Sequence, residues 1–83
     1  MGEYEKLISV LETLSQIEED LTVPKNIRFH IKTAMTALQE NEVQLAVKID
    51  KALEALTEID SDPNIPQYTR AQIWNIVSVL ECK

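Results

Sequence analysis

The sequence contains two similar copies of one segment, 42 positions apart. Pro24 and Pro66 mark the two copies, and each is followed four residues later by an arginine, Arg28 or Arg70. With the same offset and no gap, further identical residues coincide: Leu11 with Leu53, Glu12 with Glu54, Leu14 with Leu56, Ile17 with Ile59, Asp20 with Asp62, Ile31 with Ile73 and Leu38 with Leu80. The match covers two helical patterns and the turn between them. The repeating unit is therefore an αα-hairpin, about 1–40 and 41–83.

Apolar residues recur at spacings of three and four, which is the period of an amphipathic helix. We expect four helices: Gly2 to about Glu19, Pro24 to Gln39, Asn41 to about Asp60, and Pro66 to Glu81. The predicted core face of the first helix carries Leu7, Leu11, Leu14 and Ile17, and that of the second carries Ile27, Ile31, Ala34, Met35 and Leu38. The predicted core face of the third helix carries Val43, Ala46, Ile49, Leu53, Leu56 and Ile59, and that of the fourth carries Ile73, Ile76, Val77 and Leu80.

Local signals place the helix ends. Val23 is disfavoured in a helix by the proline that follows it, and Pro24 suits the first turn of the second helix. Asn41 and Gln44 have the spacing of a capping box for the third helix. The Pro-rich run 61–66 is a turn by composition. Thr69 is an alternative N-cap for the fourth helix.

The chain has only one Gly and three Pro, too few for the many turns of an all-β domain of 83 residues. It therefore predicts a single all-α domain. One hairpin cannot bury its apolar stripe, whereas two packed together can. We expect a compact antiparallel four-helix bundle of two similar αα-hairpins, related by an approximate two-fold axis. The alternative is a two-unit HEAT-like helical stack, which has a similar repeat length.

Fourteen acidic and eight basic side chains give a net charge of −6, which disfavours nucleic acids and anionic membranes as partners. The lone Cys82 excludes an intrachain disulfide and fits a reducing cytoplasm. The polar N-terminus does not resemble a signal peptide, and no apolar run approaches the ~20 residues that span a bilayer. We expect a cytoplasmic protein.

Catalytic, metal and cofactor signatures are missing from the sequence. His30 is the sole histidine, it has no second His or Cys to share a metal, and its counterpart in the repeat is the ordinary polar residue Gln72. The chain contains no Glu-x-x-His pair of the di-iron bundles, and its single Gly2 rules out a glycine-rich phosphate loop. We expect a non-enzymatic protein without a cofactor.

Two groups of residues are candidate interaction surfaces. Trp74 stands where the first copy has Lys32, which indicates an exposed or boundary position, and Tyr68 precedes it on the same helix. An exposed Trp is a frequent hot spot, so these aromatics predict self-association or a protein partner, although Trp74 could also cap the edge of the bundle. Lys25, Arg28 and Lys32 form the basic segment that would contact phosphates if nucleic acid were bound; a solvated face is the simpler interpretation.

Residues shared by both copies usually serve the fold. We therefore interpret Arg28 and Arg70 as structural side chains that reach carbonyls or a carboxylate across each turn, with Asp20 and Asp62 closing the turns. The alternative is a recurring anion or partner contact at the start of each second helix.

The run from Asp62 to Ser78, with the Pro66–Arg70 spacing and Trp74, resembles the C-terminal signature of a small archaeal group, uncharacterised protein family 0147. The run Val23–Arg28 resembles its first turn motif. The resemblance covers nearly the whole chain and implies a compact helical bundle in an archaeal cytoplasm. It implies no activity and no site residues.

Overall fold

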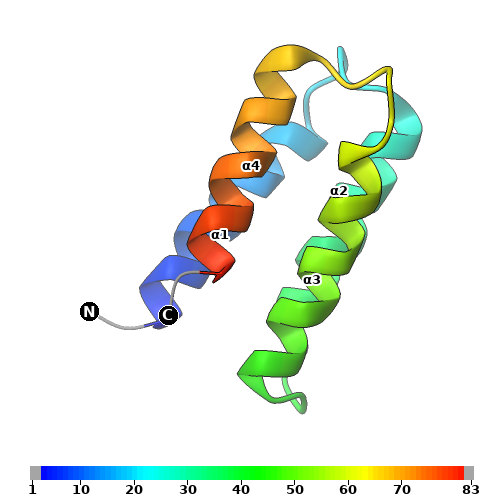
Figure 1. Cartoon of the computed structure of the whole chain (residues 1–83). Helices are drawn as coiled ribbons and strands as arrows, with labels where there is room; N and C mark the ends of the chain where they lie inside the picture. The colour runs from blue at the N-terminus through cyan, green and yellow to red at the C-terminus, as the bar shows by residue number, and fades with distance from the viewer. Residues whose placement is uncertain (1–2, 82–83) are drawn as a thin grey trace.

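The computed structural model describes residues 3–81, with side chains from Glu5 onward, as four α-helices. They are α1 (Glu3–Glu18), α2 (Lys25–Leu38), α3 (Leu45–Asp60) and α4 (Gln67–Glu81). Consecutive helices run in opposite directions (Figure 1). The helical spacing also predicts Tyr4 on the core face of the first helix, and its side chain, like Cys82, lies outside the described residues.

The helices form a closed ring of contacts. Each helix packs against the next one along the chain, and α1 also packs against α4. Within residues 3–81 the diagonal pairs, α1 with α3 and α2 with α4, are not in close backbone contact. An open two-unit stack would leave its first and last helices apart. The predicted four-helix bundle is therefore confirmed, and the HEAT-like alternative is wrong.

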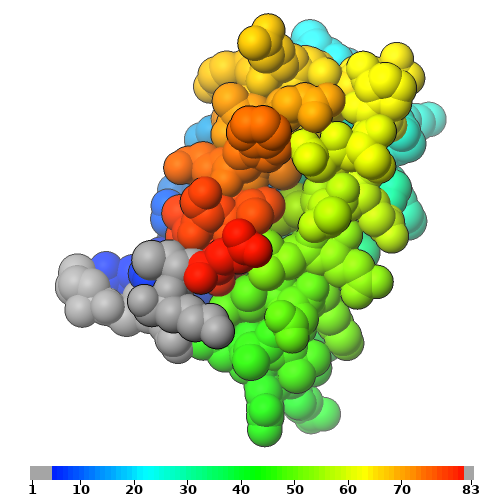
Figure 2. Space-filling model, viewed as in Figure 1, coloured from blue at the N-terminus to red at the C-terminus, as the bar shows by residue number. Residues whose placement is uncertain are grey.

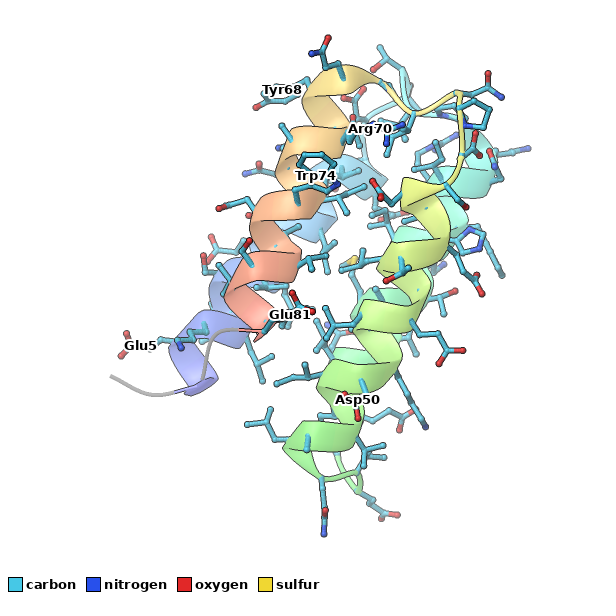
Figure 3. The ribbon with its side chains drawn as sticks, in the orientation of Figure 1. Glu5, Asp50, Tyr68, Arg70, Trp74 and Glu81 are labelled. Atoms are coloured by element: carbon cyan, nitrogen blue, oxygen red, sulfur yellow. The ribbon has the colours of Figure 1, made fainter. Side chains whose placement is uncertain are left out.

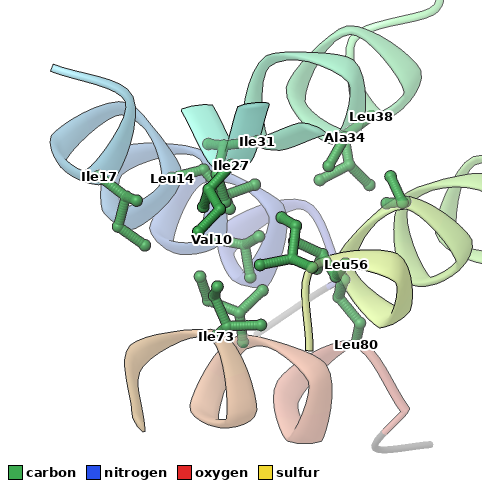
Figure 4. Close-up of a cluster of buried hydrophobic side chains, with 14 of the residues drawn as sticks. Val10, Leu14, Ile17, Ile27, Ile31, Ala34, Leu38, Leu56, Ile73 and Leu80 are labelled. Atoms are coloured by element: carbon green, nitrogen blue, oxygen red, sulfur yellow. The ribbon is translucent and has the colours of Figure 1, made fainter. Parts of the chain in front are cut away.

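The core lies between the four helices and is aliphatic. Figure 4 shows its side chains converging from every helix. Ile31 and Ile73, which the repeat places at matched positions, are both fully enclosed. The buried hydrophobic residues are Val10, Leu14, Ile17, Val23, Ile27, Ile31, Ala34, Leu38, Ala52, Ala55, Leu56, Ile59, Ile65, Ile73, Ile76 and Leu80.

The predicted core face of α3 is partly wrong. Ala46 is exposed, whereas Ala52 and Ala55, which the predicted stripe left out, are buried. The cause is the packing of α3 against α2, which is the most extensive helix pair of the bundle. Two small side chains at this contact let the helix backbones approach closely. The buried face of α3 is therefore rotated toward α2.

Two predicted helix starts also differ from the structure. Helix α3 begins at Leu45, so Asn41 is not its N-cap; Gln44 takes that position without a side-chain capping bond. Residues 39–44 are needed to turn the chain between antiparallel helices, and Gln44 is extended, with its carbonyl accepting the Lys48 N–H at 3.0 Å. Pro24 is the N-cap of α2 rather than its first helical residue, because its ψ of 150° is extended. Helix α4 follows Pro66 directly, and Thr69 is buried inside it.

Candidate interaction surfaces

Trp74 lies on the outer side of α4, and 57% of its surface is exposed. Its indole N–H donates to Asp60 Oδ1 of α3 at 2.8 Å. The same oxygen accepts a hydrogen bond from Arg70 Nη1 at 3.2 Å. The Asp60 carboxylate therefore fixes the indole and satisfies its only donor. The part of Trp74 that is exposed to solvent is its apolar ring, which the hydrogen bond to Asp60 keeps in one orientation.

A hollow of about 120 Å³ adjoins this ring in the groove between α3 and α4. Its lining is mainly apolar: Leu56, Thr57, Asp60, Ile73, Trp74 and Val77. Pockets that bind drug-sized ligands have volumes of roughly 300–1,000 Å³. The hollow is therefore of a size for one aliphatic side chain.

Acidic side chains accompany Trp74 on the face formed by α3 and α4, which is turned toward the viewer in Figure 2. Figure 3 shows Asp50 of α3 and Glu81 of α4 on this face. Both residues are exposed. The guanidinium of Arg70 is held by Asp60 Oδ1 and by the carbonyls of Asp60 and Asp62. The face therefore combines an aromatic ring, an apolar hollow and negative charge.

Tyr68 is 74% exposed but does not line this hollow. It lies six residues before Trp74, which corresponds to about 120° around a helix of 3.6 residues per turn. In Figure 3 the two aromatic side chains point in different directions from α4. The structure therefore does not bring the two predicted residues into one patch.

The basic segment of α2 is divided. Lys25 and Lys32 are exposed. Arg28 is half-buried, and its Nε donates to the Val23 carbonyl at 3.0 Å. Arg28 thus closes the turn before its own helix, as the structural interpretation predicts. Arg70 does the same with the Asp60 and Asp62 carbonyls at the other turn.

The aspartates of the two turns accept hydrogen bonds from residues two positions further along. The hydroxyl and backbone N–H of Thr22 donate to Asp20 Oδ1 and lower the pKa of Asp20 below 3.8. The backbone N–H of Asn64 donates to Asp62 Oδ1, and the amide of Asn26 donates to Asp62 Oδ2. Together they lower the pKa of Asp62 below 3.8. The Asn26–Asp62 bond also ties the start of α2 to the α3–α4 turn.

Sequence reasoning missed Phe29, which is 67% exposed on α2. It borders two adjoining surface hollows, of about 410 and 320 Å³, along α2 and its groove with α3. Both hollows are also lined by Thr33, Ala37 and Lys51. A signal was present, because Phe29 falls outside the apolar stripe that runs through Ile27 and Ile31.

His30 lies beside the same groove with both ring nitrogens occupied. Nδ1 is 2.8 Å from the Asn26 carbonyl, and Nε2 is 3.0 Å from Glu58 Oε2 of α3. The side chain therefore ties α2 to α3. This fits the ordinary polar role predicted for the position.

The sequence matches the Uncharacterised protein family (UPF0147) over residues 1–82. The chain belongs to the UPF0147 family. Its relatives include the UPF0147 proteins of two archaea. The protein of Methanocaldococcus jannaschii is 43% identical over 77 residues, covering 93% of this chain and 83% of the relative. The protein of Sulfurisphaera tokodaii is 41% identical over 76 residues, covering 92% and 85%.

Two solved structures share the fold. A protein of unknown function, MMP1188, superposes with a TM-score of 0.95 at 43% identity, covering 99% of this chain and 93% of that one. A UPF0147 protein from Thermoplasma acidophilum superposes with a TM-score of 0.90 at 29% identity, covering 95% and 93%. The predicted resemblance to this family is thus confirmed. The names of these UPF0147 relatives carry no activity, ligand or partner, so the comparisons establish the family and its fold.

Among the described residues, no helix is both long and apolar enough to cross a membrane. Within the same part of the chain, no three His, Cys, Asp or Glu side chains are grouped in a way that could hold a metal ion.

Proposed function

We propose that the protein is a non-enzymatic interaction module, and that its α3–α4 face binds a basic segment of another protein around Trp74. The observation that carries this proposal is the state of Trp74. Its ring is exposed, and its N–H is already bonded to Asp60. A partner therefore gains apolar contact with the ring without having to supply an acceptor for a buried donor.

The fixed orientation of the ring favours binding. A side chain that is already held loses less conformational freedom when a partner covers it. Trp is also among the residues that most often contribute large shares of interface energy. The neighbouring hollow, lined by Leu56, Ile73 and Val77, would receive one aliphatic side chain of the partner.

The charge of the α3–α4 face indicates which kind of protein segment would bind there. Asp50 and Glu81 lie on the same face as Trp74, and Arg70 is already engaged by Asp60. A segment with Lys or Arg beside an apolar residue would complement these acids, and its cation could stack on the indole. A second copy packed through this same face would bring like charges together. The proposed occupant is therefore a basic segment of a different protein.

A display selection tests this proposal directly. A library of random peptides is selected on the wild-type protein, and the enriched peptides are then measured against the variants. We expect the enriched peptides to carry Lys or Arg next to Leu, Ile or Met. Trp74→Ala should weaken them by about thirtyfold or more, the size of a hot-spot truncation.

The matched control is Tyr68→Ala, which removes another exposed aromatic from the same helix and should leave peptide binding unchanged. Thermal unfolding checks that both variants are folded. Enrichment of acidic peptides, or equal losses in the two variants, would contradict the proposal.

The non-enzymatic part of the proposal rests on the state of His30. Its Nδ1 and Nε2 lie 2.8 Å from the Asn26 carbonyl and 3.0 Å from the Glu58 carboxylate, so both nitrogens are engaged by other groups of the chain. General-base catalysis needs a side chain within reach of a substrate proton.

Nucleic-acid binding by α2, the alternative expected from the sequence, has less support. Of its three cations, Arg28 donates to the Val23 carbonyl, which leaves Lys25 and Lys32 to contact phosphates. Electrostatic affinity for nucleic acid is greatest at low salt. A binding assay with single- and double-stranded RNA and DNA at low salt tests this alternative. We expect that any binding seen in this assay is not removed by Lys25→Ala or Lys32→Ala.

A further inference from the structure

The outer face of α2 and α3 carries a second surface, separate from Trp74. Its centre is Phe29, which lines two hollows together with small residues: Thr33 and Ala37 line both, and Ala55 lines one. Phe29 is 67% exposed, so its ring is available for contact with another surface.

The charges along this face follow an order. Along α2, Lys25 and Lys32 come first and Glu40 follows the helix. Along α3, Lys48 and Lys51 come first and Glu54 and Glu58 follow. Five of these residues line the hollows: Lys32, Glu40, Lys51, Glu54 and Glu58. Lys25 and Lys48 lie one helical turn before Phe29 and Lys51, on the same sides of their helices.

Because α2 and α3 are antiparallel, the sign of the charge alternates both along each helix and from one helix to the other. The 3.0 Å contact between His30 and Glu58 places the basic end of α2 beside the acidic end of α3 (compare Figure 1). The other end of the face combines the lysines of α3 with Glu40. Positive and negative ends thus alternate around the four corners of the face.

Such a pattern complements a second copy of itself. When a two-fold axis crosses both helices, the Lys51 end of α3 meets the Glu58 end of the same helix in the other copy. Each contact occurs twice, as in any isologous interface. The same rotation brings Phe29 opposite the partner's hollow at Thr36 and Ala37. The whole chain is acidic, whereas this face carries four lysines and three glutamates, so its net charge does not oppose the meeting of two copies.

We propose that the protein forms a two-fold homodimer through the outer face of α2 and α3, with Phe29 of each copy seated in the hollow of the other. The dimer leaves the Trp74 face uncovered, because that face is formed by α3 and α4. The inference stands independently of the proposed function: self-association is measured here without any peptide.

Sedimentation velocity over a range of concentrations tests the proposal. We expect wild-type protein to sediment as a dimer at high concentration. Phe29→Asp should weaken the dimer by about tenfold or more, whereas Tyr68→Asp, the matched control on α4, should leave it intact. Circular dichroism confirms that the variants are folded.

Charge reversal identifies the arrangement of the two copies. Lys51→Glu and Glu58→Lys should each weaken self-association, because each places like charges opposite one another. An equimolar mixture of the two variants should recover a dimer, since every reversed contact then meets its complement. A change in monomer stability alone cannot produce this recovery.

Three results would overturn the proposal. The first is a wild-type protein that remains monomeric at the highest concentration. The second is an equal effect of Phe29→Asp and Tyr68→Asp. The third is a mixture of the charge-reversed variants that stays monomeric.

Discussion

At the scale of single residues, Asp60 connects the fold to the proposed site. One carboxylate oxygen accepts from both Arg70 and Trp74, so the side chain that holds Arg70 at the α3–α4 turn also orients the exposed indole. The corresponding turn between α1 and α2 has Arg28 bonded to the Val23 carbonyl. Each turn is therefore held by an arginine, but Arg70 makes more hydrogen bonds than Arg28.

This difference predicts unequal costs of removing the two arginines. Arg70→Ala loses hydrogen bonds to two carbonyls and one carboxylate, and should lower the free energy of unfolding by about 2–3 kcal/mol. Arg28→Ala loses the bond to Val23 and should cost about 1 kcal/mol. Urea denaturation measures both values. An Arg28→Ala loss equal to or larger than that of Arg70→Ala would contradict this account of the turns.

Asp62 predicts a specific sensitivity to acid. The Asn64 N–H and the Asn26 amide lower its pKa in the folded state below 3.8. A carboxylate with a lowered folded pKa stabilises the protein at neutral pH, and this contribution is lost as pH falls below 3.8 and through the folded pKa. Asp62→Asn keeps an acceptor oxygen but cannot titrate. Its unfolding free energy should therefore decline less steeply with acid than that of wild type. Parallel slopes in urea denaturation between pH 5 and pH 2 would refute this role.

Residue-scale features were predictable from sequence only in part. Lys32 at the position matching Trp74 indicated exposure, and Trp74 is exposed. The Trp74–Asp60 bond was not predictable, because the two residues are separated by a turn whose geometry decides whether they meet. Phe29 lay off the apolar stripe, but a sequence does not reveal that α2 and α3 leave hollows beside it.

At the scale of elements, the apolar period predicted four helices and most of the core. Helix ends were harder, because they depend on how many residues the chain needs to reverse direction. The Asn41–Gln44 capping box is an example: its spacing is right, yet α3 starts at Leu45. The buried face of α3 also differs from the predicted one, because tight packing against α2 buries Ala52 and Ala55.

The start of α3 offers a stabilising substitution. Gln44 occupies the N-cap with extended backbone and no side-chain capping bond. Gln44→Asp should bond one of the first N–H groups of the helix and raise the free energy of unfolding by about 1 kcal/mol. Asn41→Ala, at the position first predicted as the cap, should have no measurable effect in the same urea titration. A loss of stability in Asn41→Ala would mean that Asn41 caps α3 in solution.

The matched core positions of α2 and α4 provide a second element-scale test. Ile31 and Ile73 are both fully buried, so Ile→Ala at either should cost about 2–5 kcal/mol. Val47→Ala is the control, because Val47 lies outside the core of α3 with 41% of its surface exposed, and its truncation should change stability little. Losses well under 1 kcal/mol at both isoleucines would show that the helix faces are misassigned.

At the scale of the whole molecule, the closed bundle offers two different outer faces. The α3–α4 face is acidic with a fixed Trp74 ring, which suits a basic partner. The α2–α3 face has alternating charges around Phe29, which suits a second copy. The two proposals together describe a dimer that carries two separate Trp74 faces. The closed arrangement followed from the apolar pattern, whereas the chemistry of each face became visible only once the helices were placed side by side.

The central claim is that a basic segment covers Trp74, and the fluorescence of that residue measures it directly. Trp74 is the only tryptophan, so its emission reports this face alone. Titration with a selected basic peptide should shift the emission to shorter wavelength with saturation. The Asp50→Lys, Glu81→Lys double variant should weaken binding about fivefold or more. Saturable binding that leaves the Trp74 emission unchanged, or that the double variant does not weaken, would contradict the account.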